Sequence, residues 1–86
     1  MKTDKVEAAT VWIEGEGWKP ALLFPGRAHV RAVIITPKVV VRRIPLDDIR
    51  TPLKGTVSKI ASQFRGVARR HGSTKEARRL LATVKS

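Results

Sequence analysis

Residues 51–72 read TPLKGTVSKIASQFRGVARRHG, and the hydrophobic spacing of the chain changes within this stretch. Its apolar residues recur at intervals of three and four, which is typical of one face of an amphipathic helix. These residues are Val57, Ile60, Ala61, Phe64, Val67 and Ala68. Thr56 is a predicted N-cap, and Gly72 is a predicted C-terminal stop that follows a basic last turn. The stretch therefore predicts a helix between these two residues.

A second helix is predicted directly after Gly72. Ser73 and Glu76 have the spacing of a capping box, in which the serine accepts from the third helical N–H and the glutamate reaches back. An apolar face follows at helical spacing, made of Ala77, Leu80, Leu81 and Val84. Residues 54–86 are therefore expected to form two basic amphipathic helices that pack on the rest of the chain.

Upstream of residue 54 the chain has the pattern of short strands. Four runs rich in β-branched and apolar residues are separated by turn signals. The runs are Lys5–Ile13, Trp18–Phe24, Arg27–Thr36 and Lys38–Ile44. Alternation between two faces is clearest in the third run. Pro20 places the start of the second strand at an edge or bulge. The predicted class is α+β: a small antiparallel β-barrel or sheet of four or five strands over residues 1–53, followed by the two helices in a single domain.

The strand region resembles a small SH3-like or Tudor-like barrel. The resemblance rests on WKPALL (18–23), RAVII (31–35), VVV (39–41) and IPLDDIR (44–50). It implies a short 3₁₀ turn before the last strand. Thr51-Pro52-Leu53 leaves little room for a full final strand, so the barrel is either open or closed by the N-terminal strand or the first helix.

The helical region resembles a resolvase-type helix-turn-helix. VSKIASQF (57–64) is similar to the first helix of that motif, and ARRL (77–80) after Ser73-Thr74 is similar to the start of its recognition helix. The family has a turn of three to four residues, whereas here eight residues, Arg65 to Gly72, intervene. The resemblance implies that Lys75, Arg78 and Arg79 contact bases or phosphates.

Net charge points to a polyanionic partner. The 86 residues carry 18 Lys+Arg against 7 Asp+Glu, a net charge of +11, and residues 54–86 hold nine Lys+Arg but one acid. A face that only solubilises usually mixes both signs. The candidate phosphate contacts are Lys59, Arg65, Arg69, Arg70, Arg78 and Arg79, with Arg42, Arg43 and Lys75 in support.

Size and charge together suggest a DNA-binding accessory or regulatory factor of a bacterium, phage or plasmid, with DNA favoured over RNA. The alternative is a protein–protein interaction module that uses its charge for steering. In that case the partner is an acidic protein, or a second copy bound through apolar residues left uncovered on the small barrel: Leu80, Leu81 and Val84.

Three aromatic residues, Trp12, Trp18 and Phe24, are expected to fill the core, because a small barrel needs bulky side chains. Two other interpretations remain open for them. They could form an aromatic cage for a methylated cation, or a platform on which nucleic-acid bases stack.

Catalysis is the function class with the weakest support. The chain has no cysteine, its two histidines lack ligand spacing, and no phosphate-cradling glycine loop is present. Asp47-Asp48 is interpreted as part of a connecting turn rather than a metal or acid–base pair. We therefore expect a non-enzymatic protein without metal or cofactor. No targeting or membrane-spanning segment is recognised, so a cytoplasmic location is expected.

Overall fold

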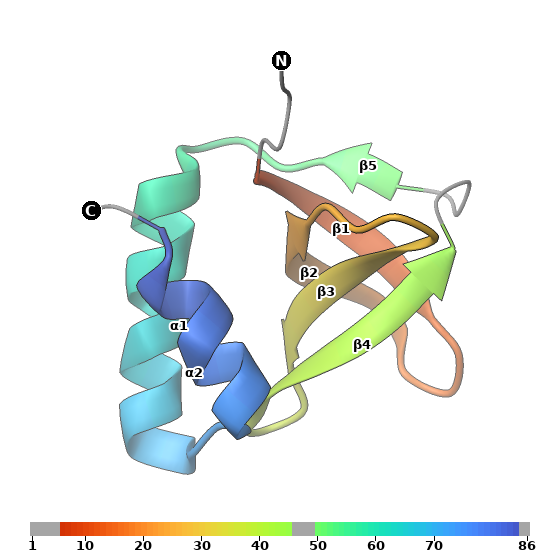
Figure 1. Cartoon of the computed structure of the whole chain (residues 1–86). Coiled ribbons are helices and arrows are strands. Elements are labelled where there is room, and N and C mark those ends of the chain that lie inside the picture. Colours follow the sequence, from red (N-terminus) through yellow and green to blue (C-terminus); the bar gives the residue numbers. More distant parts are fainter. Residues whose placement is uncertain (1–5, 46–49, 85–86) are drawn as a thin grey trace.

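The structure is a computed structural model that describes residues 6–45 and 50–84 (Figure 1). Strands precede helices along the chain: β1 (Glu7–Ile13), β2 (Gly17–Phe24), β3 (His29–Ile35), β4 (Val39–Pro45), β5 (Arg50–Pro52), α1 (Val57–His71) and α2 (Lys75–Ala82). This confirms the predicted α+β class, with the four predicted strands shifted by at most two residues at their ends. The proposed turn at Asp47-Asp48 lies outside the described residues.

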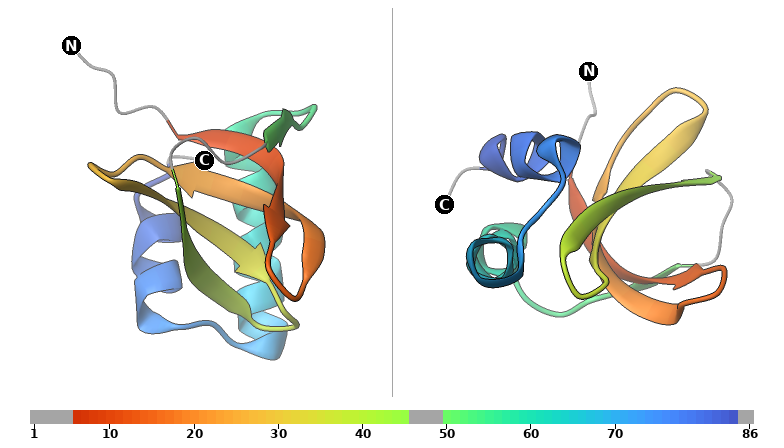
Figure 2. Two further views of the ribbon diagram at one scale, coloured as in Figure 1. Left: turned by 90° about the vertical axis from the view of Figure 1, so that its right-hand side faces the viewer. Right: turned by 90° about the horizontal axis from the view of Figure 1, so that it is seen from below.

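The sheet is antiparallel and has the order β4-β3-β2-β1-β5. Consecutive hairpins join β1 to β4, and β5 then returns to pair with Ala9–Val11 of β1 through residues 50–52. Because β4 and β5 are the two edges of this order, the five described strands form an open sheet. The sheet is strongly curled, as the views in Figure 2 show. Of the barrel and the sheet that the sequence allows, the structure has a sheet that is open between β4 and β5.

Both faces of the curled sheet are covered with apolar side chains. The inner face holds one cluster, which includes Val11, Leu23, Ala32 and Ile34. The outer face holds a second cluster, in which sheet residues such as Leu22 and Val33 meet the helices. Alternation along each strand explains the division, because successive side chains point to opposite faces.

Pro20 occupies the edge position that its missing N–H predicts. It pairs with Thr10 of β1, while the pairing of β2 with β3 starts only at Leu22. The first half of β2 therefore has a strand neighbour on one side only, where a proline is tolerated.

Helix α1 has the predicted ends. The side chain of Thr56 accepts a hydrogen bond from the backbone N–H of Lys59, and the N–H of Gly72 donates to the carbonyl of Ala68 over 2.8 Å. Gly72 has a φ of +91°, a region that glycine enters without the steric cost of a side chain. The eight residues that separate the two sequence motifs belong mostly to α1, which continues to His71.

The predicted capping box at Ser73 is wrong. Thr74 is the N-cap of α2, and its hydroxyl accepts from the N–H of Ala77. The reason is a backbone pairing with β4: the N–H of Val39 donates to the Gly72 carbonyl over 2.9 Å, and the N–H of Thr74 donates to the Val39 carbonyl over 3.0 Å. This pairing holds Ser73 in an extended conformation. The three-residue connection is thereby attached to the sheet, and α2 runs back beside α1 (Figures 1 and 2).

Candidate nucleic-acid interface

Six cations of the two helices are exposed and form what we call the helix-pair surface: Lys59, Arg69, Arg70, Lys75, Arg78 and Arg79. Four ion pairs are found among residues 6–45 and 50–84, and none of them includes a member of this surface. The only acid on either helix is Glu76, which pairs with Arg43 of β4 at 3.8 Å. The six charges of this surface therefore have no carboxylate partner within the described residues.

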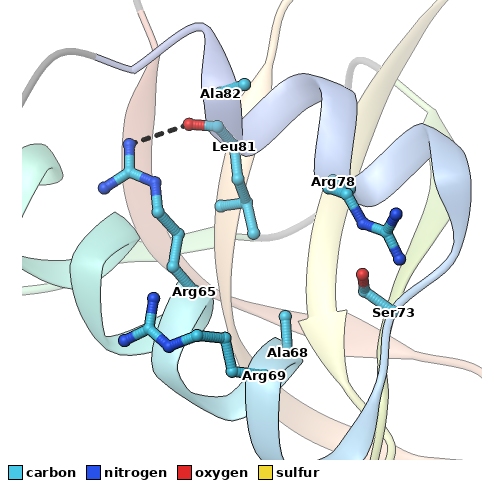
Figure 3. Close-up of a pocket in the computed structure, with 7 residues that line it drawn as sticks. All are labelled: Arg65, Ala68, Arg69, Ser73, Arg78, Leu81 and Ala82. Carbon is cyan, nitrogen blue, oxygen red and sulfur yellow. Dashed lines mark hydrogen bonds between the residues drawn. The ribbon is translucent and has the colours of Figure 1, made fainter.

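A groove of about 380 Å³ lies between α1 and α2 (Figure 3). Arg65 and Arg69 border it from α1, and Arg78 borders it from α2. Its remaining lining is mostly apolar and comes from Ala68, Ser73, Leu81 and Ala82. The fold thus brings together, at one depression, three arginines that are separated by up to 13 residues in the sequence.

Four members of the helix-pair surface do not line this groove: Lys59, Arg70, Lys75 and Arg79. Lys59 and Arg70 are 11 residues apart, close to three helical turns, so they share a stripe of α1 that is rotated away from Arg69. On α2, Lys75 is three residues from Arg78 and four from Arg79, which places the three side chains on neighbouring positions of the solvent side. The six cations are therefore exposed on the solvent side of two neighbouring helices.

Arg65 differs from the other candidates because its guanidinium group is engaged inside the fold. Its Nη2 donates to the carbonyl oxygen of Leu81 over 2.9 Å and to that of Val84 over 2.6 Å. These carbonyls lie at the C-terminal end of α2, where the helix dipole favours a cation, and that of Leu81 also accepts from the N–H of Val84 over 3.2 Å. Arg65 therefore connects α1 to the end of α2, a role that no local sequence pattern indicates.

Replacing Arg65 by methionine should lower the free energy of unfolding by about 1–3 kcal/mol, since the Val84 carbonyl loses its charged donor and the Leu81 carbonyl keeps only the N–H of Val84. The same replacement at the exposed Arg69 removes an equal charge from the same helix and should change stability much less. Urea unfolding followed by circular dichroism measures both. Equal midpoints for the two variants would contradict the role given to Arg65.

Arg42 and Arg43, the predicted supporting pair, both reach solvent from β4. Arg42 lies 3.9 Å from Glu16 of the β1–β2 turn, and Arg43 lies 3.8 Å from Glu76 of α2. Alternation along the strand turns the two side chains to opposite faces of the sheet, and both are exposed. Arg43 thus lies near α2, whereas Arg42 lies near the β1–β2 hairpin.

The prediction that all three aromatic residues fill the core is correct for Phe24 and wrong for Trp12 and Trp18. Phe24 is buried, whereas the two tryptophans are 47% and 49% exposed. They face each other across β1 and β2, with ring centroids 5.8 Å apart and an angle of 72° between the ring planes. Alternation places them on the outer face of the sheet, beyond the part that the helices cover.

The apolar residues suggested for self-association are used within the chain. Leu80 and Leu81 are buried, and Val84 packs against the same cluster between the helices and the sheet. The small sheet has enough outer surface to cover α2, because its outer face is apolar at Leu22, Phe24, Val33 and Val39.

Within residues 6–45 and 50–84, no group of three or more His, Asp or Glu side chains is placed to hold a metal ion. No helix in this part of the chain is long and apolar enough to cross a membrane. Comparison of the chain with protein-family models, with curated proteins and with solved structures found no match.

Proposed function

We propose that this protein binds nucleic acid, preferentially DNA, through the helix-pair surface. The observation that carries the proposal is the presence of six exposed cations on α1 and α2, none of which is paired with a carboxylate of the described chain. Lysine and arginine without acidic neighbours are the groups that contact phosphates in such complexes.

Binding would work mainly through the phosphate backbone. Arg69 and Arg78 lie on opposite sides of one groove, so both can meet phosphates of a single strand or of neighbouring strands. Each contact releases condensed counterions, which favours association at low salt and weakens it steeply at high salt. Arg65 is not counted as a phosphate contact in this proposal, because its guanidinium group is bound to the end of α2.

Two structural resemblances support the proposal. The strand order β4-β3-β2-β1-β5 with a curled sheet is compatible with an SH3-like barrel left open between its edges. The connection of three residues between α1 and α2 has the length of the turn in a helix-turn-helix. On that likeness, Lys75, Arg78 and Arg79 at the start of α2 are the residues that approach the duplex, in a small accessory or regulatory factor of a bacterium, phage or plasmid.

A second candidate function is favoured by the apolar lining of the groove between the helices. Ala68, Leu81 and Ala82 present apolar atoms between Arg69 and Arg78. An acidic amphipathic helix of a partner protein would match this combination of apolar floor and cationic rim. This candidate makes the protein an interaction module whose charge steers the encounter.

Direct binding measurements over a range of salt distinguish the two candidates. Fluorescence anisotropy of labelled duplex DNA should show binding at about 50 mM salt and a loss of several hundredfold or more by about 200 mM, as expected for some five or six phosphate contacts. Poly-glutamate of similar charge is the control polyanion, and RNA of the same sequence tests the preference for DNA. Absence of binding at the lowest salt would reject the proposal, and equal affinity for poly-glutamate would favour the interaction module.

A further inference from the structure

The two tryptophans of this chain form an exposed pair that neither folding nor the helix-pair surface accounts for. Within residues 6–45 and 50–84, Trp12 of β1 and Trp18 of β2 are the only large apolar side chains that are exposed. Burying the exposed half of each side chain would have contributed about 1 kcal/mol. Their exposure marks a surface that gains by being covered with a ligand.

The position of the pair follows from the strand register. Ala8 pairs with Leu22 beneath the helices, and Trp12 pairs with Trp18 four residues farther along the same strands. Four residues correspond to about 13 Å at 3.3 Å per residue. Both pairs are on the outer face, so the tryptophans lie on the continuation of the surface that the helices cover and are themselves uncovered.

The ring geometry leaves flat aromatic surface open. The planes are 72° apart, so the edge of one ring is directed toward the face of the other. In such an arrangement the ring that points its edge at its partner has both of its faces free of that partner. The other ring has one face free. A planar ligand can therefore stack on the pair without separating the two rings.

Cationic groups lie next to the same surface. Trp12 lines a groove of about 370 Å³ together with Glu14 of the β1–β2 turn and with Arg42 and Arg43 of β4. The two arginines pair with Glu16 and Glu76 at 3.9 and 3.8 Å, and their side chains are 46% and 67% exposed. Ion pairs this long and this exposed contribute little, so both guanidinium groups can be redirected to a phosphate.

We propose that Trp12 and Trp18 stack with unpaired bases of single-stranded nucleic acid while Arg42 and Arg43 contact the adjoining phosphates. Aromatic platforms beside a cationic groove are how proteins hold single strands without base-pair readout. The groove is lined by two arginines and one acid, Glu14. This excess of positive charge disfavours a methylated cation as the occupant. The inference rests on the proposed function, and it adds that open, unpaired regions are the preferred target.

Intrinsic fluorescence reports on this site alone, because the chain has two tryptophans and no tyrosine. Oligodeoxythymidine of about 12 nucleotides should quench this emission on binding, since stacking brings bases onto the rings. An abasic oligonucleotide of equal length and charge, which offers phosphates without bases, should bind without quenching. Oligouridine of the same length tests whether RNA is accepted as well as DNA.

The variant that tests the site is Trp12→Leu/Trp18→Leu, which keeps apolar side chains on the hairpin and removes the aromatic rings. Its affinity for labelled oligodeoxythymidine should fall by about tenfold to a hundredfold, and its affinity for the abasic oligonucleotide should not change. Each single replacement leaves one tryptophan as reporter and shows which ring the base covers. Circular dichroism establishes that the variants are folded, and Thr10→Ala on the same face of β1 is the matched control.

The outcomes separate this inference from the proposed function. Equal affinity for the thymidine and abasic oligonucleotides, with no quenching, would overturn the stacking site and leave phosphate binding by the helices intact. Failure of every nucleic acid to bind at low salt would remove both. Quenching by millimolar choline in place of oligonucleotide would show that the pair is a cation cage, and would equally overturn the inference.

Discussion

Replacing Arg69, Arg78 and Arg79 by glutamine together is expected to lower the affinity for duplex DNA about a hundredfold at 0.1 M salt. Each phosphate contact contributes close to one unit to the slope of log K against log salt, so the slope should decrease by two to three units. None of the three side chains takes part in an ion pair or in the apolar core of the described chain, so the fold should be unaffected. Anisotropy titrations at several salt concentrations measure both quantities.

The matched control replaces three exposed cations outside the helices, Arg27, Lys38 and Lys54, by glutamine. Both triple variants reduce the net charge of +11 by the same amount. If the helix-pair surface is the interface, the control should lose much less affinity and keep most of the salt slope. Equal losses in the two variants would mean that only the total charge matters, and would contradict an interface on the helices.

Replacing Phe64 by alanine is expected to destabilise the fold more than the replacement of Arg65 or of either tryptophan. Phe64 is buried on the face of α1 that packs on the sheet, in one cluster with Leu22 and Leu81. Truncation of a buried phenylalanine costs about 3–5 kcal/mol, because transfer free energy is lost and a cavity remains. This is a large share of the stability of about 5–15 kcal/mol that small domains have.

Thermal melting followed by circular dichroism should show the loss as a fall of at least about 12 °C in Tm for a chain of this length. Phe64→Leu keeps most of the volume and should be much milder. Trp12→Leu, a change at an exposed aromatic residue, should cost no more than about 1 kcal/mol. A Phe64→Ala variant that melts like the unchanged protein would contradict the packing of α1 on the outer face of the sheet.

The candidate site was only partly predictable from sequence. The cations of both helices follow from residue identity and helical spacing, and the structure leaves six of them exposed. Arg65 has the same apparent pattern as Arg69, yet its partners are carbonyls of residues 81 and 84. No local rule links a residue of one helix to the end of the next, so this contact depends on how the two helices pack.

The burial of the aromatic residues was also only partly predictable from the sequence. Phe24 and Trp18 belong to one strand and look equally suited to a core. Phe24 lies where the outer face of the sheet is covered by α2 and its neighbours, whereas Trp18 lies beyond that cover at the hairpin end. Which part of a face is buried depends on the length and position of the covering helices, and these are not encoded in the strand itself.

The sequence alone determined the elements of this protein: strands by alternation, helices by three-and-four spacing, the start of α1 by Thr56 and its end by Gly72. These signals are local, because they act through neighbouring backbone groups and side chains a few residues apart. Only the tertiary structure decided the open sheet, the start of α2 at Thr74, the engagement of Arg65 and the exposure of the tryptophan pair. Each of these depends on contacts between segments that are distant in the chain, such as the hydrogen bonds between Val39 and residues 72 and 74.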